Sequence, residues 1–88
     1  MSTLPVIDLI ATGQNIAKKR KHAGYSVRQM QKILGFSTPQ AIYKWQRGES
    51  LPSIDNLTVL AAVLNVKMDD IIVYKPPDAP PEPPPEES

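Results

Sequence analysis

Polar side chains that suit contact with nucleic-acid bases are spaced to share one face of a short predicted helix, residues 39–47. They fall at positions i, i+3, i+4 and i+7 of that helix: Gln40, Tyr43, Lys44 and Arg47. In the major groove of DNA, a glutamine amide can pair with adenine N6 and N7, and a lysine can donate to guanine O6 and N7. The alternative is that this face is ordinary solvated surface, and the spacing alone does not decide between the two.

The sequence contains little that suits catalysis or metal binding. Its single histidine, His22, stands beside Lys21, and there is no cysteine, which excludes disulfides and thiolate sites. Asp69 and Asp70 are adjacent, and they fit the first turn of a helix better than an acid–base pair. No glycine-rich phosphate loop occurs, and each glycine is predicted to mark a helix boundary: Gly13, Gly24, Gly35 and Gly48. We therefore expect no enzyme activity, no metal and no cofactor.

Capping signals around the polar face predict two short helices joined by a turn. A capping box at Ser26–Gln29 opens a helix that ends at Leu34, and the turn Gly35–Ser37 follows. Thr38 is predicted to cap the next helix, Pro39–Arg47, with proline at a position where its missing N–H costs nothing. This order of elements is typical of a helix-turn-helix between residues 26 and 47.

Three further helices are predicted to complete a small all-α domain. They span Thr12–Ala23, Ser53–Leu64 and Met68–Tyr74, and the first two begin with a residue that can cap a helix. The segment Ile71–Tyr74 also has the composition of a short strand, although no partner strand is obvious. Apolar residues at helical spacing are predicted to form the core: Met30, Ile33, Leu34, Ile42, Trp45, Ile54, Leu57, Leu60, Ala61 and Leu64.

Charge and proline content separate a basic body from an acidic tail. All ten lysine and arginine residues lie between Lys18 and Lys75, against five acids in residues 1–75, so this part carries a net charge of +5. Residues 76–88 hold four acids, no base and seven of the ten prolines. We therefore expect an N-terminal arm at 1–11, a folded domain at 12–75, and a disordered, acidic, proline-rich tail at 76–88.

No stretch is apolar enough for a membrane span or a signal peptide, so we expect a cytoplasmic, nucleoid-associated protein. The basic body would attract a polyanion, although a solvated basic face is the simpler explanation of such a charge pattern.

The sequence also resembles the phage-repressor/Cro-type (XRE) transcriptional regulators over about residues 7–73. The resemblance lies in segments where glycines, caps and apolar positions match together: Gly13–Arg20, Leu34–Ser37 and Pro39–Pro52. More narrowly, the chain is similar to small stand-alone members from Gram-positive gut bacteria and their mobile elements. The resemblance implies a lambda-repressor-like domain of four or five helices. It also implies binding to double-stranded DNA and regulation of transcription, and we expect this chain to act as a repressor.

By position, the resemblance implies which residues touch DNA. Base contacts are expected from the third helix and the residue before it: Thr38, Gln40, Ala41, Tyr43 and Lys44. Phosphate contacts are expected from Ser26, Arg28 and Arg47.

The chain departs from the family pattern in and around the helix-turn-helix. Val27 stands where the family often has a glutamine that touches phosphate, Gln31 replaces a small alanine, and the turn before Thr38 is one residue longer. Where the family often pairs an arginine with a glutamate, this chain has Arg20 and Gln46. A neutral hydrogen bond would replace the ion pair, and we expect Arg20 to be freer to contact phosphate.

A second function class is a protein-interaction module, such as an antitoxin or an adaptor, built on the same fold. The tail contains a P-x-x-P sequence at residues 77–80, which suits a protein partner, although a solubilising extension would look the same. A homodimer is possible through Ile71–Tyr74 or the N-terminal arm, and a monomer that dimerises only on DNA is equally compatible with the sequence.

Overall fold

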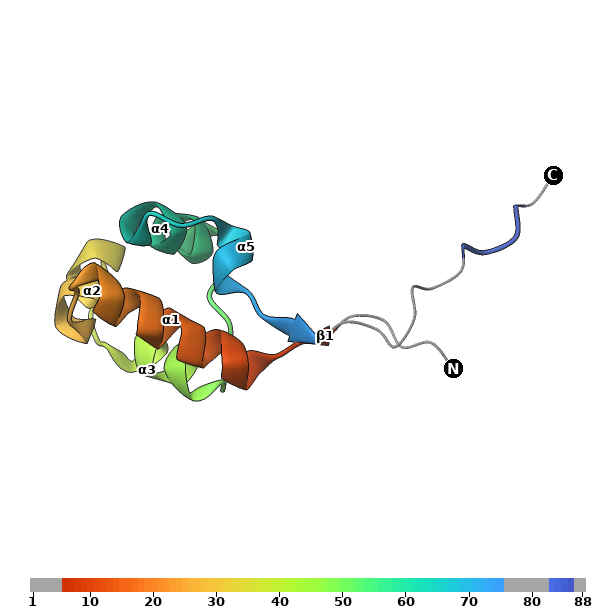
Figure 1. The fold of residues 1–88 in the computed structure, drawn as a ribbon. Coiled ribbons are helices and arrows are strands. Elements are labelled where there is room, and N and C mark those ends of the chain that lie inside the picture. The colour runs from red at the N-terminus through yellow and green to blue at the C-terminus, as the bar shows by residue number, and fades with distance from the viewer. Residues whose placement is uncertain (1–5, 76–82, 87–88) are drawn as a thin grey trace.

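Helices dominate the computed structural model, which describes residues 6–75 and 83–86. The helices are α1 (Leu9–Ala23), α2 (Val27–Leu34), α3 (Gln40–Arg47), α4 (Ile54–Leu64) and α5 (Met68–Ile71). The strands are β1 (Val6–Ile7) and β2 (Tyr74–Lys75), and the order along the chain is β1-α1-α2-α3-α4-α5-β2. The two strands lie at one end of the helical domain and α2 lies at the other (Figure 1). The predicted helical domain of four or five helices is confirmed, with five helices and a short two-stranded ribbon.

The first helix begins earlier than its sequence predicts. Asp8 is the N-cap residue, and its side chain accepts a hydrogen bond from the backbone N–H of Ala11 at 3.0 Å. The predicted cap, Thr12, is instead completely buried one turn into α1. Its hydroxyl accepts from the backbone N–H of Val73 at 2.9 Å and lies 3.1 Å from the Val73 carbonyl oxygen, to which it donates. The prediction of a start at Thr12 is wrong because a distant segment uses the hydroxyl.

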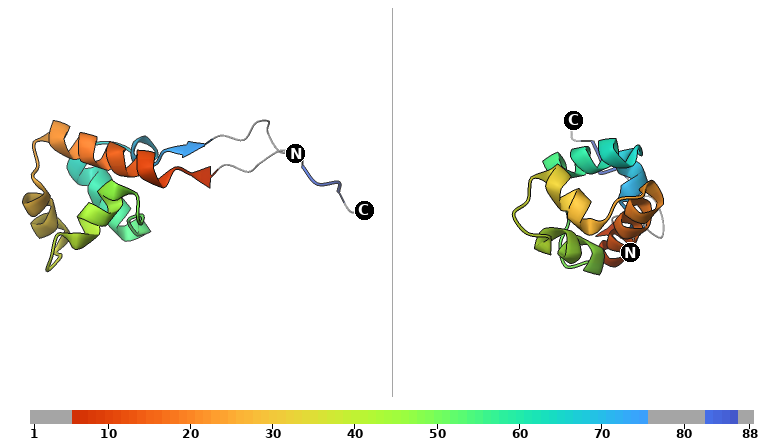
Figure 2. Two further views of the ribbon diagram at one scale, coloured as in Figure 1. Left: turned by 90° about the horizontal axis from the view of Figure 1, so that it is seen from below. Right: turned by 90° about the vertical axis from the view of Figure 1, so that its left-hand side faces the viewer.

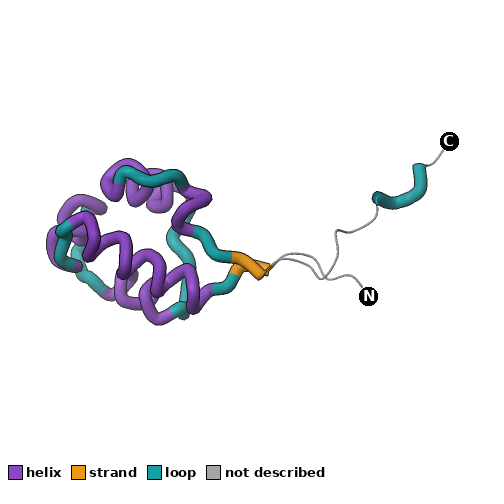
Figure 3. Tube along the Cα trace, viewed as in Figure 1, coloured by secondary structure: helices purple, strands orange, loops and turns teal. Residues whose placement is uncertain are grey.

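The two ends of the folded domain meet in a short antiparallel ribbon, drawn in orange in Figure 3. Val6 pairs with Lys75 and Ile7 with Tyr74, and the Asp8 N–H extends the pairing to the Val73 carbonyl at 2.8 Å. The fifth helix therefore ends at Ile71 rather than Tyr74, and the strand partner that the sequence did not reveal is the N-terminal segment. Residues 6–11 of the predicted arm belong to the folded domain, whereas residues 1–5 lie outside the described residues.

The acidic tail is described only at residues 83–86, which are exposed and have no regular secondary structure. The rest of the predicted disordered tail lies outside the described residues.

Most of the other predicted helix boundaries are confirmed. The capping box of α2 is complete: Ser26 Oγ accepts from the Gln29 N–H at 3.0 Å, and Gln29 Oε1 accepts from the Ser26 N–H at 2.8 Å. Ser53 caps α4, and Asn65 ends it in the left-handed conformation at φ 56°. The third helix begins one residue later than predicted, because Pro39 is its N-cap and no side chain caps it.

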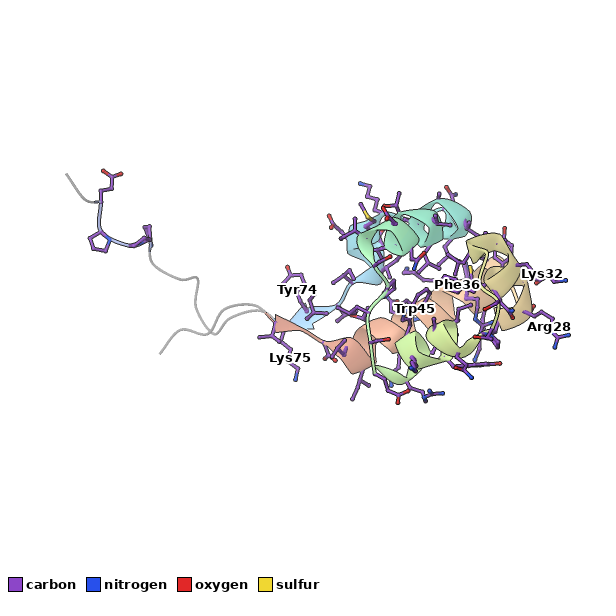
Figure 4. The ribbon with its side chains drawn as sticks, turned by 180° about the vertical axis from the view of Figure 1, so that it is seen from behind. Arg28, Lys32, Phe36, Trp45, Tyr74 and Lys75 are labelled. Atoms are coloured by element: carbon purple, nitrogen blue, oxygen red, sulfur yellow. The ribbon has the colours of Figure 1, made fainter. Side chains whose placement is uncertain are left out.

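The buried core takes side chains from all five helices, whose arrangement is seen from two further sides in Figure 2. It consists of Ile16, Met30, Ile42, Trp45, Leu57, Leu60, Ala61, Leu64 and Ile71. Two residues predicted to be in the core are exposed instead: Ile33 at 44% and Ile54 at 73%. Phe36, in the turn between α2 and α3, packs edge-on against Trp45 with ring centroids 5.8 Å apart (Figure 4).

Gly13 lies inside α1, where the backbone of α3 comes into contact with it. A Cβ atom at this position would collide with the Trp45 carbonyl oxygen and would lie 2.9 Å from the Gln46 carbonyl oxygen. The prediction that Gly13 marks a helix boundary is therefore wrong. Glycine is required here because α1 and α3 pack backbone against backbone.

Replacing Gly13 by alanine is expected to force α1 and α3 apart. We expect the free energy of unfolding to fall by at least about 2 kcal/mol, the usual cost of overpacking where backbone must move. Urea unfolding followed by circular dichroism measures this loss. The matched control is Gln14→Ala on the exposed side of the same helix, which is expected to change stability by less than about 0.5 kcal/mol. Equal stability of the two variants would show that the α1–α3 contact is not tight.

Candidate nucleic-acid interface

The third helix has one face in the core and one face in solvent. Ile42 and Trp45 are 0% and 4% exposed, so the inward face is anchored. On the outward side, the predicted contact residues are exposed: Thr38, Gln40, Tyr43, Lys44 and Arg47. Ala41 is half-buried and packs against the core, so little of its side chain is left for a ligand.

The second helix adds basic side chains beside this face. Arg28 and Lys32 are exposed and stand one turn apart on α2, at the end of the molecule away from the ribbon (Figure 4). Ser26 is exposed too, but its hydroxyl is already an acceptor in the capping box. Lys32 was not among the predicted contact residues. Its i, i+4 spacing from Arg28 is the sequence signal that could have identified it.

A depression of about 450 Å³ lies between α2 and α3 and is called here the α2–α3 pocket. Its lining residues are Val27, Arg28, Gln31, Lys32, Pro39 and Tyr43. Because α2 and α3 both contribute to it, the exposed cations of α2 and the exposed face of α3 belong to one continuous surface.

A side chain of α2, Gln31, bonds to the turn between α2 and α3. Its side-chain amide donates to the Phe36 carbonyl oxygen at 3.2 Å, so a backbone group in the turn has a partner. The Gln31 side chain thus fixes the turn to the helix that precedes it.

Arg20 lies inside the domain rather than on this surface, with only 8% of its area exposed. Its Nε donates to Gln46 Oε1 at 3.0 Å, and its Nη1 donates to the Tyr25 carbonyl oxygen at 2.8 Å. The predicted hydrogen bond to Gln46 is therefore present. The expectation of a freer Arg20 is not met, because the guanidinium joins α1 to α3 and to the loop before α2.

The charges on the α2–α3 surface are mostly uncompensated. Within residues 6–75 and 83–86, the ion pair in the structure is that of Arg47 with Glu49, so Arg47 shares its charge with an acid. Arg28, Lys32 and Lys44 have no ion-pair partner among those residues. A surface with three such cations beside exposed amide and phenol groups is suited to a polyanion with hydrogen-bonding edges.

Over the same part of the chain, no helix is both long and apolar enough to cross a membrane. No group of three or more His, Asp or Glu side chains is arranged to hold a metal ion in the described segments.

Comparisons with known proteins agree with this geometry. The helix-turn-helix family model HTH_3 matches residues 16–71, which include α2, the turn and α3. The restriction-modification controller protein C.AhdI from Aeromonas hydrophila is similar in structure, with a TM-score of 0.65 and 23% sequence identity over 73% of this chain and 96% of that chain. The clp gene regulator ClgR from C. glutamicum is also similar, with a TM-score of 0.61 and 19% identity over 70% of this chain and 79% of that chain.

No protein of curated function is significantly similar to this sequence. The family match nevertheless covers most of the folded domain and includes both helices of the candidate interface. The chain therefore belongs to the HTH_3 helix-turn-helix family, the XRE-type DNA-binding transcription regulators, which are not enzymes.

Proposed function

We propose that this regulator represses transcription by placing α3 in the major groove of a specific double-stranded DNA site. The observation that carries the proposal is the division of α3 into two faces. Ile42 and Trp45 anchor the helix in the core, so the polar outward face is free of any packing role. Amide, phenol and ammonium groups on an exposed helix are the groups that read base edges in this groove.

Each predicted contact residue has a place in the proposed complex. Base contacts come from the exposed side chains Thr38, Gln40, Tyr43 and Lys44 on α3 and just before it, whereas Ala41 is half-buried and has only a small surface left for a contact. Phosphate contacts come from α2 and the end of α3, namely Ser26, Arg28 and Arg47, with Lys32 added because it lines the same pocket as Arg28. Arg20 holds α1 against α3 and acts on DNA only by positioning the recognition helix.

A palindromic site would require a homodimer, with half-sites about 34 Å apart. Exposed apolar side chains on the ribbon, Val6 at 62% and Tyr74 at 58%, offer one surface for association. Association only on DNA is the alternative. Such a protein would act in the cytoplasm, on the nucleoid. A source among Gram-positive gut bacteria rests on the sequence resemblance alone.

The second candidate is a protein-interaction role, as an antitoxin or adaptor, for which the P-x-x-P sequence at residues 77–80 is the supporting observation. The gene neighbourhood distinguishes the protein-interaction role from the repressor role. An adjacent toxin-like reading frame favours this role, whereas paired half-sites upstream of the gene favour the repressor.

Removing the central polar groups of α3 is expected to abolish specific binding. In Gln40→Ala/Lys44→Ala, the affinity for the upstream DNA should fall about 30-fold or more, because each base contact contributes roughly 1–3 kcal/mol. Fluorescence anisotropy with a labelled duplex and a scrambled competitor measures the loss. The matched control is Gln14→Ala/Lys67→Ala, which removes the same residue types from exposed positions outside α2 and α3. Equal affinities of the two double variants would count against base reading by α3.

The salt dependence of binding distinguishes phosphate contacts from positioning residues. In Arg28→Ala, the plot of the log binding constant against log salt concentration should become less steep by about 0.9. The free energy of unfolding should be nearly unchanged. Arg20→Ala should leave the slope unchanged. It should instead lower the free energy of unfolding by about 1–3 kcal/mol, because two half-buried acceptors lose their donor. A reduced slope with unchanged stability in Arg20→Ala would reverse this assignment.

A further inference from the structure

A second depression lies between the C-terminal part of α1 and the end of α4, and it is called here the α1–α4 pocket. Its volume is about 320 Å³, at the lower end of the range of small-molecule sites, roughly 300–1,000 Å³. The described residues that line it are Asn15, Lys18, Lys19, His22, Ala23, Leu64 and Val66. None of them is among the proposed DNA contacts.

The most buried side chain of the lining is apolar and is fixed by the way α4 ends. Leu64 is 6% exposed and belongs to the core, and Val66 is half-buried and packs against the same core. The Val66 N–H donates to the Ala61 carbonyl oxygen at 3.0 Å, around the left-handed Asn65. The two apolar side chains therefore face the pocket from a rigid helix end.

The neutral polar residue of the lining, Asn15, also has a structural role. Its Nδ2 donates to the carbonyl oxygens of Asp70 and Ile71 at 2.7 and 3.0 Å, which joins α1 to α5. Both amide hydrogens are thus used within the fold, and the side-chain oxygen is left as an acceptor.

Two lysines give the pocket positive charge. Lys18 is exposed and Lys19 is half-buried, and neither forms an ion pair within residues 6–75 and 83–86. None of the described lining residues is acidic. Basic residues in the last turn of α1, such as His22, suit the negative end of the helix dipole. Lys18 and Lys19 lie before that turn, so the dipole does not account for their charges.

The α1–α4 pocket faces away from the recognition helix. Gly13 and Arg20 lie on the side of α1 that contacts α3. At about 100° per residue, Asn15 and His22 are roughly half a turn around α1 from Gly13. A ligand in the pocket therefore does not compete for space with DNA bound at α3.

We propose that the α1–α4 pocket binds a small amphipathic anion, a carboxylate carried on a short aliphatic body. The carboxylate pairs with Lys18 and Lys19, and the aliphatic body lies against Leu64 and Val66. A small molecule fits better than a protein partner, because a stable protein interface needs about 800 Å² on each side, whereas the apolar lining consists of three side chains. The proposal goes beyond DNA binding and does not depend on it.

The probe is octanoate, titrated into the isotope-labelled full chain and followed by two-dimensional amide NMR. We expect saturable shifts that cluster at residues 15–23 and 64–66. From butanoate through hexanoate to octanoate, the affinity should rise about twofold to fourfold for each added methylene, the size of effect for a methylene moved from water to an apolar surface. Octylamine has a similar body and the opposite charge, and it should bind at least about tenfold more weakly than octanoate.

Variants connect the binding to the residues of the pocket, and circular dichroism checks that each variant is folded. In Lys18→Gln/Lys19→Gln, the affinity for octanoate should fall about threefold to tenfold, because two charge contacts are lost. The matched control Lys67→Gln/Lys75→Gln removes two exposed lysines outside the pocket and should bind like the wild type. Ala23→Glu adds a repelling carboxylate at the exposed end of α1 and should weaken binding more than Ala23→Gln, which adds a side chain of the same size without charge.

Several results would overturn the proposal. They are shifts spread over the whole surface or clustered elsewhere, equal affinity for octylamine, and an equal loss of affinity in the two lysine double variants. Shifts of the Asp78 and Glu86 amides on addition of octanoate would show that the acidic tail of the chain itself occupies the pocket and is displaced, which would overturn it too. The DNA-binding measurements are made separately, so failure of this inference and failure of the proposed function are observed in different experiments.

Discussion

The backbone contact between α1 and α3 at Gly13 sets the position of the recognition helix. With no side chain on Gly13, the carbonyl oxygens of Trp45 and Gln46 lie directly against α1. Two turns further along the same helix, the buried Arg20 guanidinium donates to the Gln46 side chain. One steric contact and one hydrogen bond thus hold α3 along α1, and its outward face is oriented by residues that never reach the surface.

Two contacts hold the turn between α2 and α3 against the helices that it joins. The ring of Phe36 packs edge-on against Trp45, and its carbonyl oxygen accepts from the Gln31 amide. These contacts fix the separation of α2 and α3 and keep the α2–α3 pocket between them.

The fold decides where the basic residues of the chain lie relative to the outward face of α3. The body of the chain has an excess of basic residues, but total charge does not say where they gather. The fold places Arg28 and Lys32 at the α2–α3 pocket and exposes Lys44 on α3. None of the three is in an ion pair within the described residues, while Arg47 is partly neutralised by Glu49. Cations thus lie on the same surface as groups proposed to read bases, which favours productive encounters with DNA.

The sequence by itself determined the features whose partners are close along the chain. The capping box at Ser26 and the helix end at Asn65 are formed by hydrogen bonds between residues at most five positions apart. The polar face of α3 follows from helical periodicity. Only the tertiary structure decided the features whose partners are distant. The Thr12 hydroxyl forms hydrogen bonds with Val73, 61 residues away, and Arg20 donates to Gln46, 26 residues away. The physical reason is that short-range signals depend on backbone geometry alone, whereas burial and long-range pairing depend on how the helices pack.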